Sequence, residues 1–139
     1  MRLTTDDSEM FSKNGPYLEY IFLQSKPLNQ GFRFSQKKMQ TDMLPHEAAQ
    51  LIIDNMQADP RIHAFKLITN EPVKISNHLG FKLTYTYQDQ FGVLIQSVYY
   101  GVVLPQSFLN LRYTATQRYY YHQELPAFEK LINTLQITP

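Results

Sequence analysis

The stretch that decides the fold runs from Gly80 to Thr138 and begins GFKLTYTYQDQFGVLIQSVYYGVVLPQSFLNLRYTAT over residues 80–116. Side chains alternate between the two faces of a strand, so residues 81–88 divide into two sets. The apolar set is Phe81, Leu83, Tyr85 and Tyr87, and the polar set is Lys82, Thr84, Thr86 and Gln88. This alternation predicts a sheet with one buried face and one solvent-exposed face. Residues 93–103, apolar on both faces, indicate a central strand, and residues 108–116 indicate its neighbour.

Two amphipathic helices are predicted outside these strands. The first begins near Pro45, because a proline fits the first helical position, and ends before Asp59-Pro60. Asp42 is expected to help cap it. Its buried stripe follows the helical spacing of three and four residues and comprises Ala48, Ala49, Leu51, Ile52, Ile53 and Met56. The second helix is predicted to open at Pro126, with a buried stripe of Phe128, Leu131, Ile132 and Leu135.

The remaining elements complete an α+β order. Strands are expected at residues 17–24, 32–35, 62–69 and 73–76. Residues 1–16 are polar and end in the turn sequence Asn14-Gly15-Pro16, which predicts a flexible N-terminal arm. Residues 17–139 are then expected to form a single domain, since 139 residues are enough for one hydrophobic core.

Composition excludes several classes of function. The net charge is only +1, which argues against a nucleic-acid binder that neutralises many phosphates. Residues 60–118 carry six basic side chains against two acidic ones, which predicts a mildly basic sheet surface. The absence of cysteine excludes disulfides, zinc–thiolate sites and iron–sulfur clusters. No apolar run approaches the length of a membrane span.

No catalytic or metal-binding motif stands out. His46-Glu47 lacks the second histidine of a zinc-binding HExxH helix, because Gln50 occupies that position. Ser97 and Ser107 do not lie in a nucleophile elbow. We therefore expect no catalytic residues, no metal and no cofactor, and a protein that is not an enzyme.

The tyrosines suggest one candidate site, a groove for a ligand or partner. Its residues are Tyr99, Arg112, Arg118, Tyr119 and Tyr121, of which Tyr119 and Tyr121 would share a face if the strand at 108–116 continued. Aromatic rings beside arginines could bind an apolar or anionic ligand, or a partner peptide. The simpler alternative is that the rings pack inward and the arginines are solvated or paired with carboxylates. The sequence leaves both open.

The chain also resembles a known family. Over the later part, the resemblance rests on GFKLTYTY at 80–87, on Tyr99-Tyr100-Gly101, on LRYTA at 111–115 and on FEKLINTLQI at 128–137. Nearer the start, it rests on NGPYLEYI at 14–21 and MLPHEAA at 43–49. These strings are similar to those of small bacterial lipoproteins and envelope proteins with a PsbP/DcrB/Mog-like fold.

The resemblance implies a twisted antiparallel sheet flanked by helices, as an α/β/α sandwich, and export through a lipid-bearing cysteine upstream of Met1. We therefore expect a non-catalytic binding or accessory domain of a bacterial envelope lipoprotein. It would face the periplasm, be a monomer or weak dimer, and bind a protein partner or small ligand. Its membrane contact would be only an N-terminal lipid anchor absent from this chain. The alternatives are a cytoplasmic adaptor using the basic sheet face, or a small-ligand carrier using the tyrosines.

Overall fold

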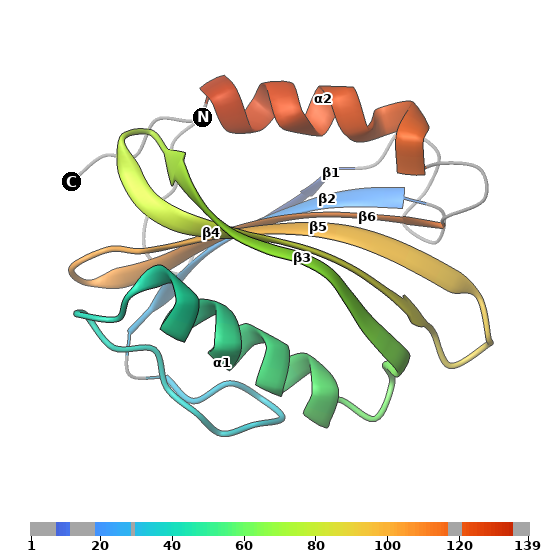
Figure 1. Ribbon diagram of the computed structural model, residues 1–139, viewed down its shortest axis with the longest axis horizontal. Coiled ribbons are helices and arrows are strands. Elements are labelled where there is room, and N and C mark those ends of the chain that lie inside the picture. The colour runs from blue at the N-terminus through green and yellow to red at the C-terminus, as the bar shows by residue number, and fades with distance from the viewer. Residues whose placement is uncertain (1–7, 12–18, 29, 117–120, 135–139) are drawn as a thin grey trace.

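Six antiparallel strands form one twisted sheet in the order β1-β2-β6-β5-β4-β3, with a helix on each face (Figure 1). The computed structural model describes residues 8–11, 19–28, 30–116 and 121–134, and it gives only the backbone for residues 8–11, 19 and 121–124. The elements are β1 (Ser8–Phe11), β2 (Glu19–Pro27), α1 (Pro45–Ala58), β3 (His63–Ile75), β4 (His78–Gln88), β5 (Leu94–Val103), β6 (Ser107–Thr116) and α2 (Tyr121–Thr134). The expected α+β fold, a twisted sheet flanked by helices, is confirmed.

The path of the chain explains this strand order. After β2 the chain crosses one face through α1 and reaches β3 at the far edge of the sheet. From there β3, β4, β5 and β6 run back as neighbours until β6 pairs with β2. Helix α2 then lies on the opposite face from α1 (Figure 1). The prediction of one solvent-exposed face is therefore wrong, because each face carries its own helix and its own buried cluster.

Helix α1 confirms the predicted bounds and stripe, but its cap differs. All six stripe residues are buried. Asp42 is exposed, and the first turn is instead capped by Glu47, whose Oε1 accepts the backbone N–H of Leu44 at 3.0 Å. A carboxylate here also complements the positive end of the helix dipole. The spacing for this capping contact is visible in the sequence, since Glu47 is three residues after Leu44.

The strand predicted at residues 32–35 does not form. This stretch is a turn, and Phe32 is buried against the ring of Phe108 with a centroid distance of 6.3 Å. The backbone N–H groups of Phe34 and Ser35 donate to Asn55 Oδ1 on α1, at 3.0 and 3.2 Å. A helix side chain therefore satisfies the donors that a neighbouring strand would have satisfied.

Three further boundaries differ from those predicted. The strands expected at 62–69 and 73–76 are one strand, β3, which accommodates Pro72 because it is an edge strand. Ser8–Phe11, within the expected arm, pairs with β2 as β1. Helix α2 begins at Tyr121, five residues before Pro126, so the chain after β6 does not continue as a strand through Tyr121. Leu135 lies outside the described residues.

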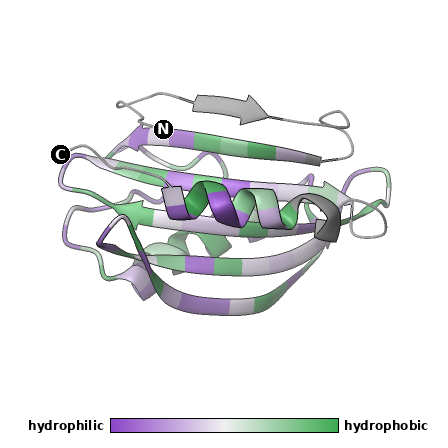
Figure 2. Ribbon diagram, turned by 90° about the horizontal axis from the view of Figure 1, so that it is seen from above, coloured by the Kyte–Doolittle hydropathy of each residue, from purple (hydrophilic) through white to green (hydrophobic). Residues whose placement is uncertain are grey.

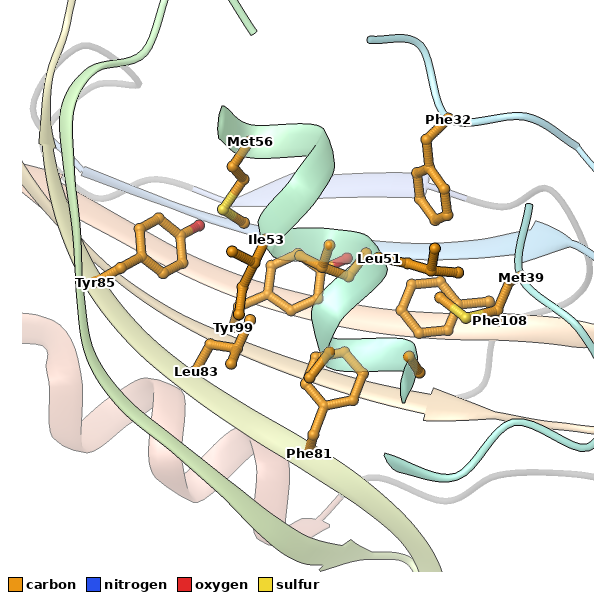
Figure 3. Close-up of a cluster of buried hydrophobic side chains, with 13 residues drawn as sticks. Phe32, Met39, Leu51, Ile53, Met56, Phe81, Leu83, Tyr85, Tyr99 and Phe108 are labelled. Atoms are coloured by element: carbon orange, nitrogen blue, oxygen red, sulfur yellow. The ribbon is translucent and has the colours of Figure 1, made fainter. Parts of the chain in front are cut away.

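The two buried clusters differ in composition. On the α2 face, Phe128 and Ile132 of α2 pack on strand residues such as Leu111 and Tyr113, and Figure 2 shows this helix lying over the middle of the sheet. On the α1 face, the mainly aliphatic stripe of the helix packs on a group of aromatic rings (Figure 3). The rings are those of Phe32, Phe81, Tyr85, Tyr99 and Phe108.

Candidate functional site

The candidate site lies on the α1 face of β6, where the strand changes from apolar to polar. Alternation points Phe108, Asn110, Arg112, Thr114 and Thr116 to this face, and Leu109, Leu111, Tyr113 and Ala115 to the α2 core. Helix α1 packs mainly on β3, β4 and β5. Arg112 lies on the next strand, in register with Tyr99 of β5 on one side and Phe22 of β2 on the other.

The row of residues beside Arg112 adds further rings. Thr114 pairs in register with Tyr20 of β2 and with Ser97 of β5, and Ser97 pairs with Tyr85 of β4. The hydroxyls of Ser97 and Thr114 hydrogen-bond to each other at 2.9 Å. Tyr87 follows Tyr85 on the same face, and their ring centroids are 6.1 Å apart. We call the resulting set the Arg112 cluster: Tyr20, Phe22, Tyr85, Tyr87, Tyr99 and Arg112.

The guanidinium of Arg112 contacts aromatic faces, and the described residues supply it with no counter-charge. Its central carbon lies 5.2 Å from the ring centroid of Phe22 and 5.7 Å from that of Tyr20. Its Nε is buried and has no hydrogen-bond partner in the part of the chain that the structure describes. None of the described carboxylates forms an ion pair with it. Cation–π contacts offset part of the cost of burying a charge, but an unpaired donor remains expensive.

The environment fixes the ionisation of the cluster at neutral pH. Burial raises the pKa of Tyr85 to about 12, and it raises the pKa of Tyr87 and Tyr99 as well. Burial opposes the charge of Arg112, but its interactions with the surrounding tyrosines raise the pKa of the guanidinium overall. At pH 7 the cluster therefore holds one cation among neutral tyrosines. Such a centre can bind an anion, but its tyrosines are poor bases.

Arg61 shows how this protein pairs an arginine when the pairing is structural. Asp59 is buried at the end of α1, and its carboxylate accepts the Nε and Nη2 of Arg61 at 3.1 and 3.0 Å. Burial opposes the charge of Asp59, yet the hydrogen bonds from Arg61 lower its pKa below the ordinary value. Arg112 has no equivalent among the described residues. The contrast identifies Arg112 as the unusual arginine.

The structure brings together only part of the predicted groove. Tyr99 and Arg112 are cross-strand neighbours on the α1 face. Tyr99 is 5% exposed and stacks on Phe81 with centroids 6.0 Å apart, so its ring belongs to the core. Tyr121 begins α2, which lies on the other face (Figure 1). Arg118 and Tyr119 lie outside the described residues.

Sequence reasoning missed four members of the cluster, namely Tyr20, Phe22, Tyr85 and Tyr87. Tyr85 and Tyr87 were assigned to one face of a strand, but that face was not linked to Arg112. Tyr20 and Phe22 alternate within β2, which hinted that they share a face. Their contact with Arg112 depends on the pairing of β2 with β6, whose paired residues are 80 or more positions apart in the chain, and a periodic pattern does not reveal such pairing.

The basic residues of 60–118 do not gather on one sheet face. Lys82 points to the α2 face, where its Nζ lies 3.7 Å from Glu129 Oε1, while Arg112 points to the α1 face. Lys66 and Lys74 are exposed on the edge strand β3. The expected basic sheet surface is therefore wrong for the described residues.

The described residues contain neither a metal-binding cluster nor a membrane-spanning helix. Nowhere in these ranges do three or more His, Asp or Glu side chains gather closely enough to hold a metal ion. Neither α1 nor α2 has the length and apolar character needed to cross a membrane.

Comparison with known proteins identifies the fold. No family model matches the chain, and no curated protein matches it. Among solved structures, it is similar to PA94 of Pseudomonas aeruginosa, a protein of unknown function, with a TM-score of 0.72 at 18% identity over 99% of this chain and 87% of that one. It is also similar to LpqN of Mycobacterium tuberculosis, which is involved in cell envelope biogenesis, with a TM-score of 0.58 at 15% identity over 92% and 68%. At these identities the likeness concerns the fold.

Proposed function

We propose that the protein is a non-catalytic binding domain that acts as an accessory protein of the bacterial cell envelope, and that the Arg112 cluster is its binding site. The observation that carries the binding proposal is the buried Nε of Arg112, which lies in an aromatic environment and has no hydrogen-bond partner among the described residues. A buried cation without an anionic partner contributes little to the free energy of folding. A ligand that supplies a negative charge would form a strong, charge-assisted hydrogen bond with it.

The envelope assignment has separate support. One structural neighbour, LpqN, is involved in cell envelope biogenesis, and the sequence resembles envelope proteins of the PsbP/DcrB/Mog-like fold. We propose kinship with that fold group and a lipid-anchored, periplasm-facing location. Fractionation of cells that express the full-length gene product tests this location. Recovery in the envelope fraction is expected, and recovery only in the cytoplasm, with no lipobox cysteine encoded, would reject it.

Binding is tested with the purified chain by native mass spectrometry and by thermal shift against a panel of anionic and neutral small molecules. We expect that anionic compounds raise the melting temperature of the wild type and that Arg112→Met removes this response. Arg33→Met is the matched control, because Arg33 is exposed and its guanidinium also lies 5.2 Å from a ring, that of Phe34. A flat panel, or an unchanged response in Arg112→Met, would reject the cluster as the binding site.

A further inference from the structure

We propose that the Arg112 cluster binds a carboxylate carried on an aromatic or other apolar body. The inference rests on the proposed binding function and adds the chemical class of the ligand. Three properties of the cluster support it: the unpartnered Nε–H of Arg112, the single charge among the described residues, and the partly exposed rings beside it.

The guanidinium of Arg112 interacts with the hydroxyl of Tyr85 but leaves its Nε–H without an acceptor among the described residues, which favours a planar anion. The Nε–H of Arg112 and the neighbouring Nη–H point in parallel, and this fork matches the two oxygens of a carboxylate. Because Nε is buried and has no acceptor among the described side chains and backbone groups, a bidentate carboxylate would satisfy it directly. A neutral ligand could accept a hydrogen bond but would leave the charge uncompensated.

The single charge favours a monoanion. Among the described residues, Arg61 is a second basic group whose charge interacts with that of Arg112, and Asp59 already holds it in two side-chain hydrogen bonds. A carboxylate therefore neutralises the charge of Arg112. A phosphate monoester, with a charge close to −2 at pH 7, would instead leave an excess negative charge against aromatic rings, which disfavours it.

The rings favour an apolar body next to the carboxylate. Phe22, Tyr20 and Tyr87 are half-buried, whereas Tyr85 and Tyr99 are almost fully buried. The first three therefore keep ring surface for a ligand, and the last two support Arg112 from within the core. One hydrogen bond joins the hydroxyls of Ser97 and Thr114, which reduces the need of this row for a polar ligand body.

Nuclear magnetic resonance of the arginine Nε–H groups tests the proposal in the full chain. The probes are sodium benzoate, benzyl alcohol and phenyl phosphate, which share a ring and differ in the polar group. The Arg112 resonance is assigned by its loss in Arg112→Met and its retention in Arg33→Met. We expect benzoate to shift this resonance and to bind at least about 30-fold more tightly than benzyl alcohol, a ratio typical of one charge-assisted contact. Phenyl phosphate should bind more weakly than benzoate.

A second variant separates the fork from the charge. Arg112→Lys keeps the positive charge but cannot donate two parallel hydrogen bonds, so we expect benzoate affinity at least about 10-fold below that of wild type. Circular dichroism of each variant checks that it is folded. Equal affinity in the folded Arg112→Lys protein would overturn the bidentate carboxylate.

Two other results would overturn the ligand class. One is an unmoved Arg112 resonance at about 10 mM benzoate, ten times a weak Kd of about 1 mM. The other is tighter binding of phenyl phosphate than of benzoate. If either occurs while the anion panel still shows an Arg112-dependent thermal shift, the binding function stands and the carboxylate assignment fails. If the panel is flat as well, both fail.

Discussion

The two faces of the sheet are each covered by a helix of 14 residues, yet they have different chemistry. On the α2 face, the fully buried Phe128 stacks on Tyr113, and Tyr100 closes the edge by donating to Glu129 Oε2 at 2.7 Å. On the α1 face, the aromatic rings beneath the helix continue along the sheet into the Arg112 cluster. The α2 face therefore pairs its polar groups within the protein, whereas the α1 face leaves the buried Nε of Arg112 without a described partner.

The difference between the two faces follows from the position of α1, which covers only part of its face. The α1-side residues of β6 lose apolar character from Phe108 to Thr116, and α1 packs mainly on the strands beyond them. Arg112 can lie among rings because those rings are supplied by β2, β4 and β5, and α1 contributes the core behind them. The α2 face is thus a packed core whose polar contacts are made within the protein, and the β2–β6 part of the α1 face is the surface that we propose for binding.

The largest expected effect is on the α2 face. Phe128→Ala removes a fully buried ring from α2 and should lower the free energy of unfolding by about 3–5 kcal/mol, since the cavity adds to the lost burial. Urea denaturation measures it. Phe91→Ala is the control, because Phe91 is 81% exposed and should change stability by less than about 0.5 kcal/mol. Equal effects of the two variants would contradict the placement of α2.

The next largest effect is a fall in the free energy of unfolding at alkaline pH, caused by a buried tyrosine on the α1 face. Burial raises the pKa of Tyr85 from 10.0 to about 12, so between these values the unfolded chain has lost a proton that the folded protein retains. The stability is complete below pH 10 and falls as the pH rises to 12, by about 3 kcal/mol for this group. Denaturation curves from pH 8 to 12 measure it.

Tyr85→Phe provides the control for this pH effect. The variant should lose about 3 kcal/mol less than the wild type over the same pH range, each compared with its own stability at pH 8. Tyr87 and Tyr99, whose pKa values are also raised, should leave a remaining slope. The same slope in both proteins would show that Tyr85 is not buried as described.

A smaller effect is expected at the polar contact of α2. Glu129→Gln weakens the hydrogen bond from Tyr100 and should lower the free energy of unfolding by about 1 kcal/mol. The longer contact of Glu129 with Lys82, 3.7 Å and partly exposed, should add less than about 0.5 kcal/mol. Double-mutant cycles with Tyr100→Phe and Lys82→Met separate the two, and a larger coupling to Lys82 would reverse this assignment.

The sequence was sufficient where a local pattern determines structure. The α1 stripe and the alternation of residues 81–88 were predicted correctly, because helical and strand periodicity follow from backbone geometry. The start of α2 was predicted wrongly, because Pro126 was expected to open the helix and instead lies inside it. The predicted strand at 32–35 failed because Asn55, which satisfies its N–H groups, lies about twenty residues away.

The candidate site was predictable only in part for the same reason. Tyr99 and Arg112 were chosen for their residue types, and they meet because β5 and β6 are consecutive strands. Phe22 meets Arg112 only because the meander returns to β2 after crossing the whole sheet. The same pairing of β2 with β6 brings Tyr20 next to Arg112. The sequence alone did not show that the described neighbours of Arg112 on β2 and β5 supply no counter-charge.

The most direct test of the central claim is the change in the free energy of unfolding caused by Arg112→Met, measured by urea denaturation at pH 7. Methionine fills a similar volume without a charge or an unpaired donor. We therefore predict that the variant is as stable as the wild type or more stable by up to about 2 kcal/mol, while its response to anions is lost. A loss of 2 kcal/mol or more would show that Arg112 stabilises the fold, and it would contradict a role for Arg112 in binding.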